Sequence, residues 1–146
     1  MFERFARTAR TAVEDARREA GRRGDRRIGS EHLLIAVLSD DEIAGRVGAG
    51  ADDARRAADR LDQAALAAIG LRLGEFHGTD ASAAPKHAYA MTPAAKSVIR
   101  QSLAKAGAEK SRTITTRHLM RALLEREAPD PAAALIAELQ ITDPPL

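Results

Sequence analysis

The stretch from Ile28 to Leu34 reads IGSEHLL, and 86 residues later the stretch from Ile114 to Met120 reads ITTRHLM. The agreement extends without a gap from 5–38 onto 91–124, and nine of these 34 aligned pairs are identical. A duplicated unit of this kind is two copies of one supersecondary element that bury their apolar faces together. We therefore expect two similar halves, each with its own version of one surface site.

The first copy is expected to contain four helices. Apolar residues at spacings of three and four between Phe2 and Ala20 predict an amphipathic helix, which the following glycines end. Ser30 is the expected N-cap of the second helix, since its hydroxyl can accept a backbone N–H. Asp40 or Asp41 should begin a short third helix, and Asp52 or Asp53 a fourth. The inward positions expected on the fourth helix are Leu61, Ala65, Leu66 and Ile69.

The second copy is expected to contain three helices. Thr92 followed by Pro93 predicts a capped helix that runs to about Ala108. Thr116 should cap the next helix, to about Glu127, and Asp130-Pro131 should begin the last. No segment alternates as a strand does. The sequence thus predicts an all-α domain of two pseudo-symmetric repeats, 1–69 and 91–146, joined by a linker over 70–90, with the second repeat lacking its last helix.

Composition narrows the class of protein. The 146 residues suit one domain, and 45% hydrophobic with only 3% aromatic residues suits closely packed helices. There is no cysteine, which excludes disulfides and thiolate metal sites. The apolar runs are too short to span a membrane and the N-terminus lacks a secretion signal, so we expect a soluble cytoplasmic protein. No nucleophile elbow or acid–base pair stands out, so we expect neither catalysis, cofactor nor metal.

These motifs carry a resemblance to a known family. The IGSEHLL stretch, the opening Met1 to Phe5 and the segment from Met91 to Lys96 together resemble the N-terminal domain of ClpC-type AAA+ unfoldases. That family has a twofold-repeated helical domain with a similar motif in each half. The resemblance implies a non-enzymatic docking platform of the Clp proteolysis system, whose partners are a Clp unfoldase, adaptors, substrates or phosphoarginine tags. No Gly-Lys dipeptide occurs, so no nucleotide-binding P-loop accompanies the domain.

The resemblance also implies where a ligand is bound. Glu31 takes the role of pairing with a guanidinium, while nearby N–H groups and cations hold a phosphate. The other residues implied to lie at this site are Phe2, Arg4, Phe5 and Ser30. A simpler alternative is that Glu31 only complements the dipole of its own helix.

The second copy departs from the family pattern. Arg117 stands where the family has glutamate, and a cation there opposes the helix dipole and cannot pair with a guanidinium. We therefore expect the second tag site to be lost, or changed into a site for anions. Met91 replaces a residue that is commonly aromatic, on a face that binds cyclic-peptide antibiotics in mycobacterial relatives.

Two other functions remain open from the residues. A free-standing copy of the domain would act as a decoy that sequesters cyclic peptides aimed at ClpC. Alternatively, the arginines between Arg22 and Arg27 would contact the phosphates of a nucleic acid, although no recognition helix or interleaved aromatic accompanies them. A solvated loop is the simpler reading of these arginines. His32 and His118 are expected to hydrogen-bond at their helix starts rather than to bind metal.

Overall fold

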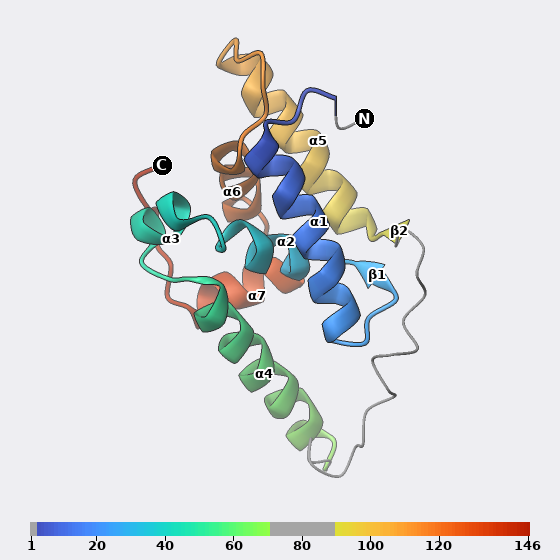
Figure 1. Ribbon diagram of the computed structural model, residues 1–146. Coiled ribbons are helices and arrows are strands. Elements are labelled where there is room, and N and C mark those ends of the chain that lie inside the picture. The colour runs from blue at the N-terminus through green and yellow to red at the C-terminus, as the bar shows by residue number, and fades with distance from the viewer. Residues whose placement is uncertain (1–2, 71–89) are drawn as a thin grey trace.

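The computed structural model describes residues 3–70 and 90–146, which are mostly helical (Figure 1). The elements in chain order are α1 (Arg7–Arg22), β1 (Arg27–Ile28), α2 (Ser30–Val37), α3 (Asp41–Val47), α4 (Ala51–Ala68), β2 (Ala90–Met91), α5 (Pro93–Ala108), α6 (Thr116–Leu124) and α7 (Pro131–Glu138). The all-α class is confirmed, and α4 has no helical counterpart after α7. Residues 71–89 of the expected linker lie outside the described ranges, so the repeat boundaries stay a prediction. None of the described helices is long and apolar enough to cross a membrane.

Short strand segments of the two copies pair with each other, which was not expected from the sequence. β1 pairs in parallel with β2, so that Ile28 lies opposite Met91. Phe5 forms an equivalent parallel bridge with Ile114. Phe5 and Met91 occupy matching positions of the repeat, as do Ile28 and Ile114, so the two pairings are reciprocal. Two-residue strands are too short to leave an alternating pattern in the sequence.

The motif hydroxyls join the copies rather than capping their own helices. The N-caps of α2 and α6 are the preceding residues, Gly29 and Thr115, and not Ser30 and Thr116 as expected. The reason is that both hydroxyls hydrogen-bond to aspartates of the other copy.

The two aspartates reached by these hydroxyls are themselves helix caps. Ser30 Oγ donates to Asp130 Oδ1 at 2.5 Å, and Asp130 is the N-cap of α7. Thr116 Oγ1 donates to Asp40 Oδ2 at 2.7 Å, and Asp40 is the N-cap of α3. The expected caps at Asp40 and Asp130 are therefore confirmed. Each motif fastens the start of a helix that belongs to the opposite copy.

Helix α2 forms the centre of the core. Its residues 32–37 are all buried, and it packs against α1, α4, α5, α6 and α7. Its equivalent in the second copy, α6, buries Leu119, Met120, Ala122 and Leu123. The two IxxxHL motifs thus lie at the starts of the two most buried helices, which holds their first turns in place.

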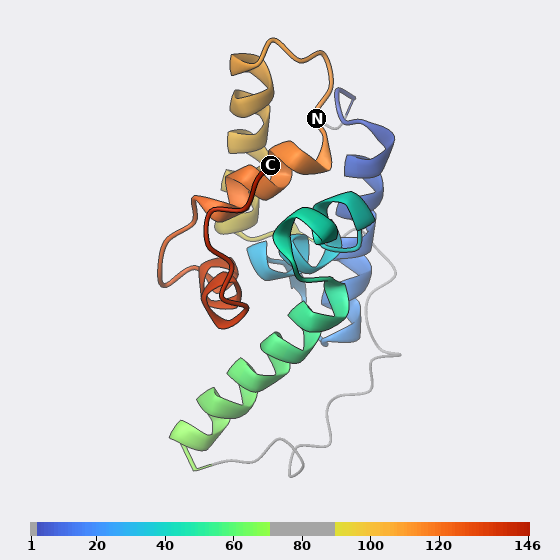
Figure 2. The same ribbon diagram turned by 90° about the vertical axis from the view of Figure 1, so that its left-hand side faces the viewer.

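Helix α4 leaves the bundle, contrary to the inward positions expected for its second half. The C-terminal end of α4 extends away from the other helices (Figures 1 and 2). Only Ala54, Ala57 and Ala58 are buried, while Ile69 is 71% exposed. Of the expected inward residues, Leu61 and Leu66 are partly exposed and Ala65 is exposed. The helix starts at Ala51 and runs for 18 residues, so its far end passes beyond the helices it packs on. Its apolar stripe continues there without a described neighbour.

Other boundaries differ by a few residues. α1 begins at Arg7 rather than near Phe2, because the chain before it pairs with the second copy. α6 ends at Leu124 rather than near Glu127. The expected start of α5, with Thr92 as cap and Pro93 at the first helical position, is confirmed, as is its end at Ala108.

Candidate functional site

The first motif is organised around a buried histidine. His32 is 1% exposed, and its Nδ1 accepts the backbone N–H of Gly29 at 2.8 Å. Nδ1 is thus an acceptor, so the hydrogen lies on Nε2, which donates to Asp25 Oδ2 at 2.8 Å. This pair of bonds fixes the ring and the first turn of α2. The expected structural role of His32 at the helix start is confirmed.

The second motif repeats this arrangement with an added cation pair. His118 Nδ1 accepts the N–H of Thr115 at 3.0 Å, and Nε2 donates to Glu109 Oε2 at 2.8 Å. Arg117 and Arg121 reach the same carboxylate at 2.8 and 2.5 Å. The hydrogen bond from His118, followed by that from Arg117, lowers the pKa of Glu109 below its ordinary value. Arg117 is therefore held by a carboxylate of its own copy.

Glu31 differs from its counterpart Arg117 in having no such partner. Its side chain is 26% exposed, and no residue of the described ranges donates a hydrogen bond to its carboxylate. The nearest ring nitrogen, His32 Nδ1, lies 3.8 Å away and already accepts a hydrogen bond from Gly29. The carboxylate folds over Gly29, where an added Cβ would lie 2.2 Å from Oε2. The motif thus presents a largely buried carboxylate whose acceptor capacity is unused.

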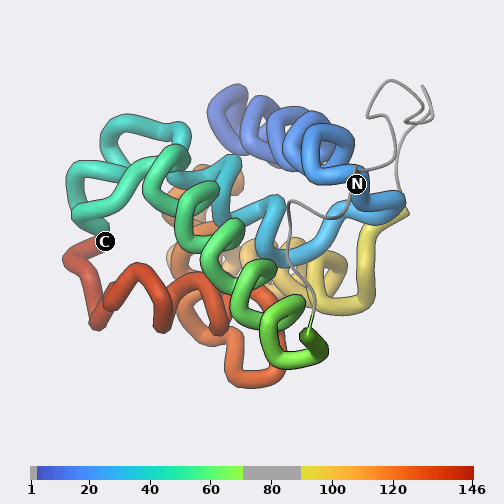
Figure 3. Tube along the Cα trace, turned by 90° about the horizontal axis from the view of Figure 1, so that it is seen from below, coloured from blue at the N-terminus to red at the C-terminus, as the bar shows by residue number. Residues whose placement is uncertain are grey.

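Glu31 lines a pocket of about 350 Å³ between the start of α2, the middle of α4 and α7. Its apolar lining comes from α4 and α7 and consists of Ala58, Leu61, Pro131, Ala134 and Leu135. Its charged lining consists of Arg23, Asp25, Glu31 and Asp62. Figure 3 shows this side of the molecule, where α4 (green) packs beside α7 (red).

Among the described residues, the single cation that lines this pocket is already paired. Arg23 donates to Asp59 Oδ1 at 3.1 Å and to Asp62 Oδ2 at 2.5 Å, and its side chain is 16% exposed. Burial opposes the charged guanidinium, but the two aspartates prevail and raise the pKa of Arg23. The lining that remains for a ligand is acidic and apolar. Sequence reasoning found Glu31 but missed Arg23 and Asp62, which only the packing of α4 brings to it.

Two residues expected at Glu31 lie at the second motif instead. Arg4 accepts the N–H of Ile114 at 2.9 Å through its carbonyl, and Phe5 is buried in its bridge with Ile114. The 16 residues of α1 separate this end of the chain from β1 by about 24 Å. The placement of Arg4 and Phe5 beside Glu31 was therefore wrong, because the pairing crosses between copies.

The remaining residues expected at the site differ in where they lie. Met91 lies beside Ile28, two residues before the start of α2, and is partly exposed. Ser30 is fully buried against Asp130 and is closed to a ligand. Phe2 lies outside the described residues, so the cyclic-peptide face that it would form is untested.

His32 has no free ring nitrogen with which to bind a metal ion. Donor atoms of Asp25, Glu31 and His32 lie within 4.8 Å of one another, which is close enough for a shared ion. Both ring nitrogens of His32, however, already take part in hydrogen bonds, one with Gly29 and one with Asp25. An ion bound through His32 would have to break one of these two bonds, so the arrangement favours an organic cation at Glu31 over a metal.

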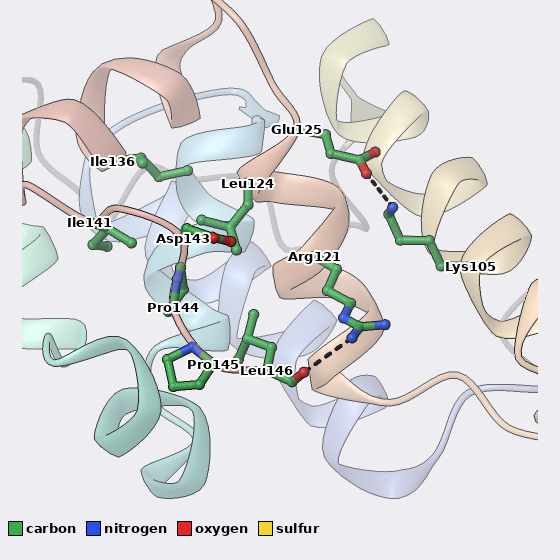
Figure 4. Close-up of a pocket in the computed structure, with 10 residues that line it drawn as sticks. All are labelled: Lys105, Arg121, Leu124, Glu125, Ile136, Ile141, Asp143, Pro144, Pro145 and Leu146. Atoms are coloured by element: carbon green, nitrogen blue, oxygen red, sulfur yellow. Dashed lines mark hydrogen bonds and ion pairs between the residues drawn. The ribbon is translucent and has the colours of Figure 1, made fainter.

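A larger pocket of about 750 Å³ lies at the other end of the second copy. Its lining consists of Leu124, Ile136, Ile141 and the segment 143–146, together with Lys105, Arg121 and Glu125 (Figure 4). Arg121 donates to the carbonyl of Leu146 at 3.1 Å, and Lys105 to Glu125 at 2.5 Å. None of the residues expected from the sequence lies in this pocket.

Comparison with solved structures identifies the fold. The structure is similar to the crystal structure of the N-terminal domain of the caseinolytic protease associated chaperone ClpD from Arabidopsis thaliana, with a TM-score of 0.72 and 18% identity over 97% of this chain and 88% of that one. No protein-family model and no curated protein sequence matches the chain. The similarity at this identity establishes the fold. The chain has the Clp N-terminal domain fold.

Proposed function

We propose that the chain is a non-enzymatic protein-docking module of the Clp system, and that Glu31 receives a guanidinium from the protein it binds. The observation that carries the proposal is the carboxylate of Glu31, which is about three-quarters buried and has no donor among the described residues. The carboxylate remains in contact with solvent, and a guanidinium could approach it and form two parallel charge-assisted hydrogen bonds. Adaptors, substrates and phosphoarginine-tagged proteins are the partners that the family resemblance implies.

The proposal assigns one guanidinium site to each chain. The equivalent position in the second copy is Arg117, whose charge is already matched by Glu109. The pairing leaves no carboxylate there for a cation to approach, since Glu109 also receives His118 and Arg121. The second motif thus has a structural role, in agreement with the expected loss of a second tag site.

The test is isothermal titration calorimetry with free arginine and free phosphoarginine as ligands. Wild type should release or absorb heat with at least one of the two ligands, at one ligand per chain. Glu31→Gln should abolish this heat, because the negative charge is lost at constant side-chain size. Arg117→Gln, the matched change in the other motif, should leave the heat unchanged. Absence of heat with both ligands, or equal heat from Glu31→Gln, would refute the reading of a guanidinium at Glu31.

Binding of nucleic acid is less well supported by the charges. Of the arginines between Arg22 and Arg27, Arg23 is paired with Asp59 and Asp62, and Arg22 lies 3.5 Å from the carboxylate of Glu19. Arg26 and Arg27 are exposed, and no ion pair is seen for them among the described residues. Affinity through counterion release grows with the number of phosphates neutralised, and two cations contribute little. A gel-retardation assay at low salt should therefore show no shift of duplex DNA.

A further inference from the structure

We propose that the pocket beside Glu31 binds a peptide segment in which an unmodified arginine or lysine stands next to an apolar side chain, in preference to a phosphorylated arginine. This inference rests on the proposed docking function and names its ligand class. It follows from three properties of the pocket, namely its lining, its charge and its volume.

The apolar part of the lining belongs to two helices that meet only in the folded chain. Leu61 of α4 is partly exposed, Leu135 of α7 is buried, and both line the pocket. Beyond Leu61 the stripe of α4 continues to Ile69, which is 71% exposed. An apolar side chain placed against Leu61 would bury apolar surface that is now in water, which favours binding. The pocket therefore favours a ligand with an apolar side chain.

The charged part of the lining favours a ligand of positive charge. Three carboxylates line the pocket, those of Asp25, Glu31 and Asp62, against one guanidinium, that of Arg23. The guanidinium of Arg23 is already paired with the carboxylates of Asp59 and Asp62, so a phosphate would have to compete with both. Asp25 lies on the same side of the pocket and accepts a hydrogen bond from His32 Nε2. A phosphoryl group here would face carboxylates, and like charges repel.

The volume limits how much of a partner enters. At about 350 Å³ the pocket is at the small end of ligand sites, which span about 300–1,000 Å³. It holds one cationic side chain and one apolar neighbour rather than a folded element. The ligand is thus a short extended segment of a partner protein, with its cation at Glu31 and its apolar side chain at Leu61.

The experiment titrates fluorescent five-residue peptides into the full chain by fluorescence polarisation. The sequences are Ala-Leu-Arg-Leu-Ala and the same peptide with phosphoarginine, with lysine, or with the neutral isostere citrulline in the middle. We expect the arginine and lysine peptides to bind at least tenfold more tightly than the other two, since a hydrogen bond to a charged group is lost or opposed. Replacing both leucines by serine should weaken the arginine peptide several-fold.

Protein variants locate the binding. Glu31→Gln should weaken the arginine peptide by about tenfold or more, and Leu61→Ala by several-fold. Glu42→Gln is the matched control, because Glu42 is an exposed glutamate of α3 outside the pocket. Thermal unfolding of each variant separates lost binding from lost folding.

The outcomes separate the inference from the function on which it rests. If the phosphoarginine peptide binds as tightly as the arginine peptide or more tightly, and Glu31→Gln abolishes it, the docking function stands and the preference is overturned. If citrulline binds as well as arginine, the charge argument is overturned. If no peptide binds, both the preference and the guanidinium site at Glu31 are refuted.

Discussion

Removing the hydroxyl of Ser30 should destabilise the fold at the junction of its two copies. Ser30 is fully buried, donates to Asp130 Oδ1 at 2.5 Å and accepts the N–H of Ala132 at 3.3 Å. Asp130 is the cap of α7, and its side chain is 4% exposed. Burial raises the pKa of this carboxyl, but the hydrogen bonds from Ser30 and its other partners lower it further, and the net shift is downward. The bond is therefore made to the charged carboxylate.

The size of the effect follows from these contacts. A hydrogen bond to a charged group contributes about 1.5–3 kcal/mol. Asp130 keeps two other donors after Ser30→Ala, Arg126 Nε and the N–H of Ala132, both at 2.8 Å. We therefore expect a loss of about 2 kcal/mol in the free energy of unfolding. For a domain of this size that corresponds to about 4–8 °C in melting temperature.

The reciprocal contact is the internal comparison. Thr116→Val removes the bond from Thr116 Oγ1 to Asp40 at 2.7 Å, but Asp40 is half-exposed and water replaces the donor. We expect that variant to lose about 1 kcal/mol. Because the two contacts are separate, the double variant should lose the sum of the two.

Urea unfolding followed by circular dichroism at 222 nm measures all three variants. Ser39→Ala is the control, since Ser39 is exposed and its hydroxyl makes no hydrogen bond with described residues. The reasoning fails if Ser30→Ala costs no more than Ser39→Ala, or if Thr116→Val costs more than Ser30→Ala. Either result would mean that the hydroxyls do not hold the copies together.

Three further changes test other parts of the structure. Because folding lowers the pKa of Glu109, the ionised carboxylate stabilises the fold above the unfolded-state pKa near 4.5, and this stabilisation is lost as pH falls through the lower folded-state pKa. The free energy of unfolding, measured from pH 7 to pH 3, should therefore fall less steeply with acid for Glu109→Gln than for wild type. An unchanged profile would contradict this. Ile69→Lys should leave stability within about 0.5 kcal/mol, whereas Leu34→Ala should cost about 2–5 kcal/mol; a comparable loss by Ile69→Lys in thermal unfolding would mean that its exposure is misjudged. Gly29→Ala should displace the carboxylate of Glu31, 2.2 Å from the new Cβ, and weaken binding of the arginine peptide several-fold at unchanged melting temperature; equal affinity would mean that the carboxylate position is unimportant.

Much of the fold could be predicted because helix starts and stripes are local signals. Thr92-Pro93 and Asp130-Pro131 specify caps through neighbouring backbone N–H groups, and both caps are present. Reasoning from apolar stripes failed for α4, whose stripe continues past Leu61, because periodicity does not say where the neighbouring helix ends.

The candidate site was predictable only in part. Glu31 was found from its motif, and it does lie at the first turn of α2 with a free carboxylate. Its companions were misplaced, because Arg4 and Phe5 were assigned to the copy in which they stand in the sequence. The crossing of the two copies reverses that assignment, and a pairing between residues about 100 positions apart leaves no local pattern.

By itself the amino-acid sequence determined the duplication, the helical class and the charge difference between Glu31 and Arg117, because each is written in neighbouring residues or in a constant offset. Only the tertiary structure decided which carboxylates surround those two positions. Glu109 neutralises Arg117 across a loop, whereas packing of α4 and α7 encloses Glu31 without a donor. The physical reason is that the electrostatic environment of a side chain depends on distances through space, and folding sets these distances independently of sequence separation.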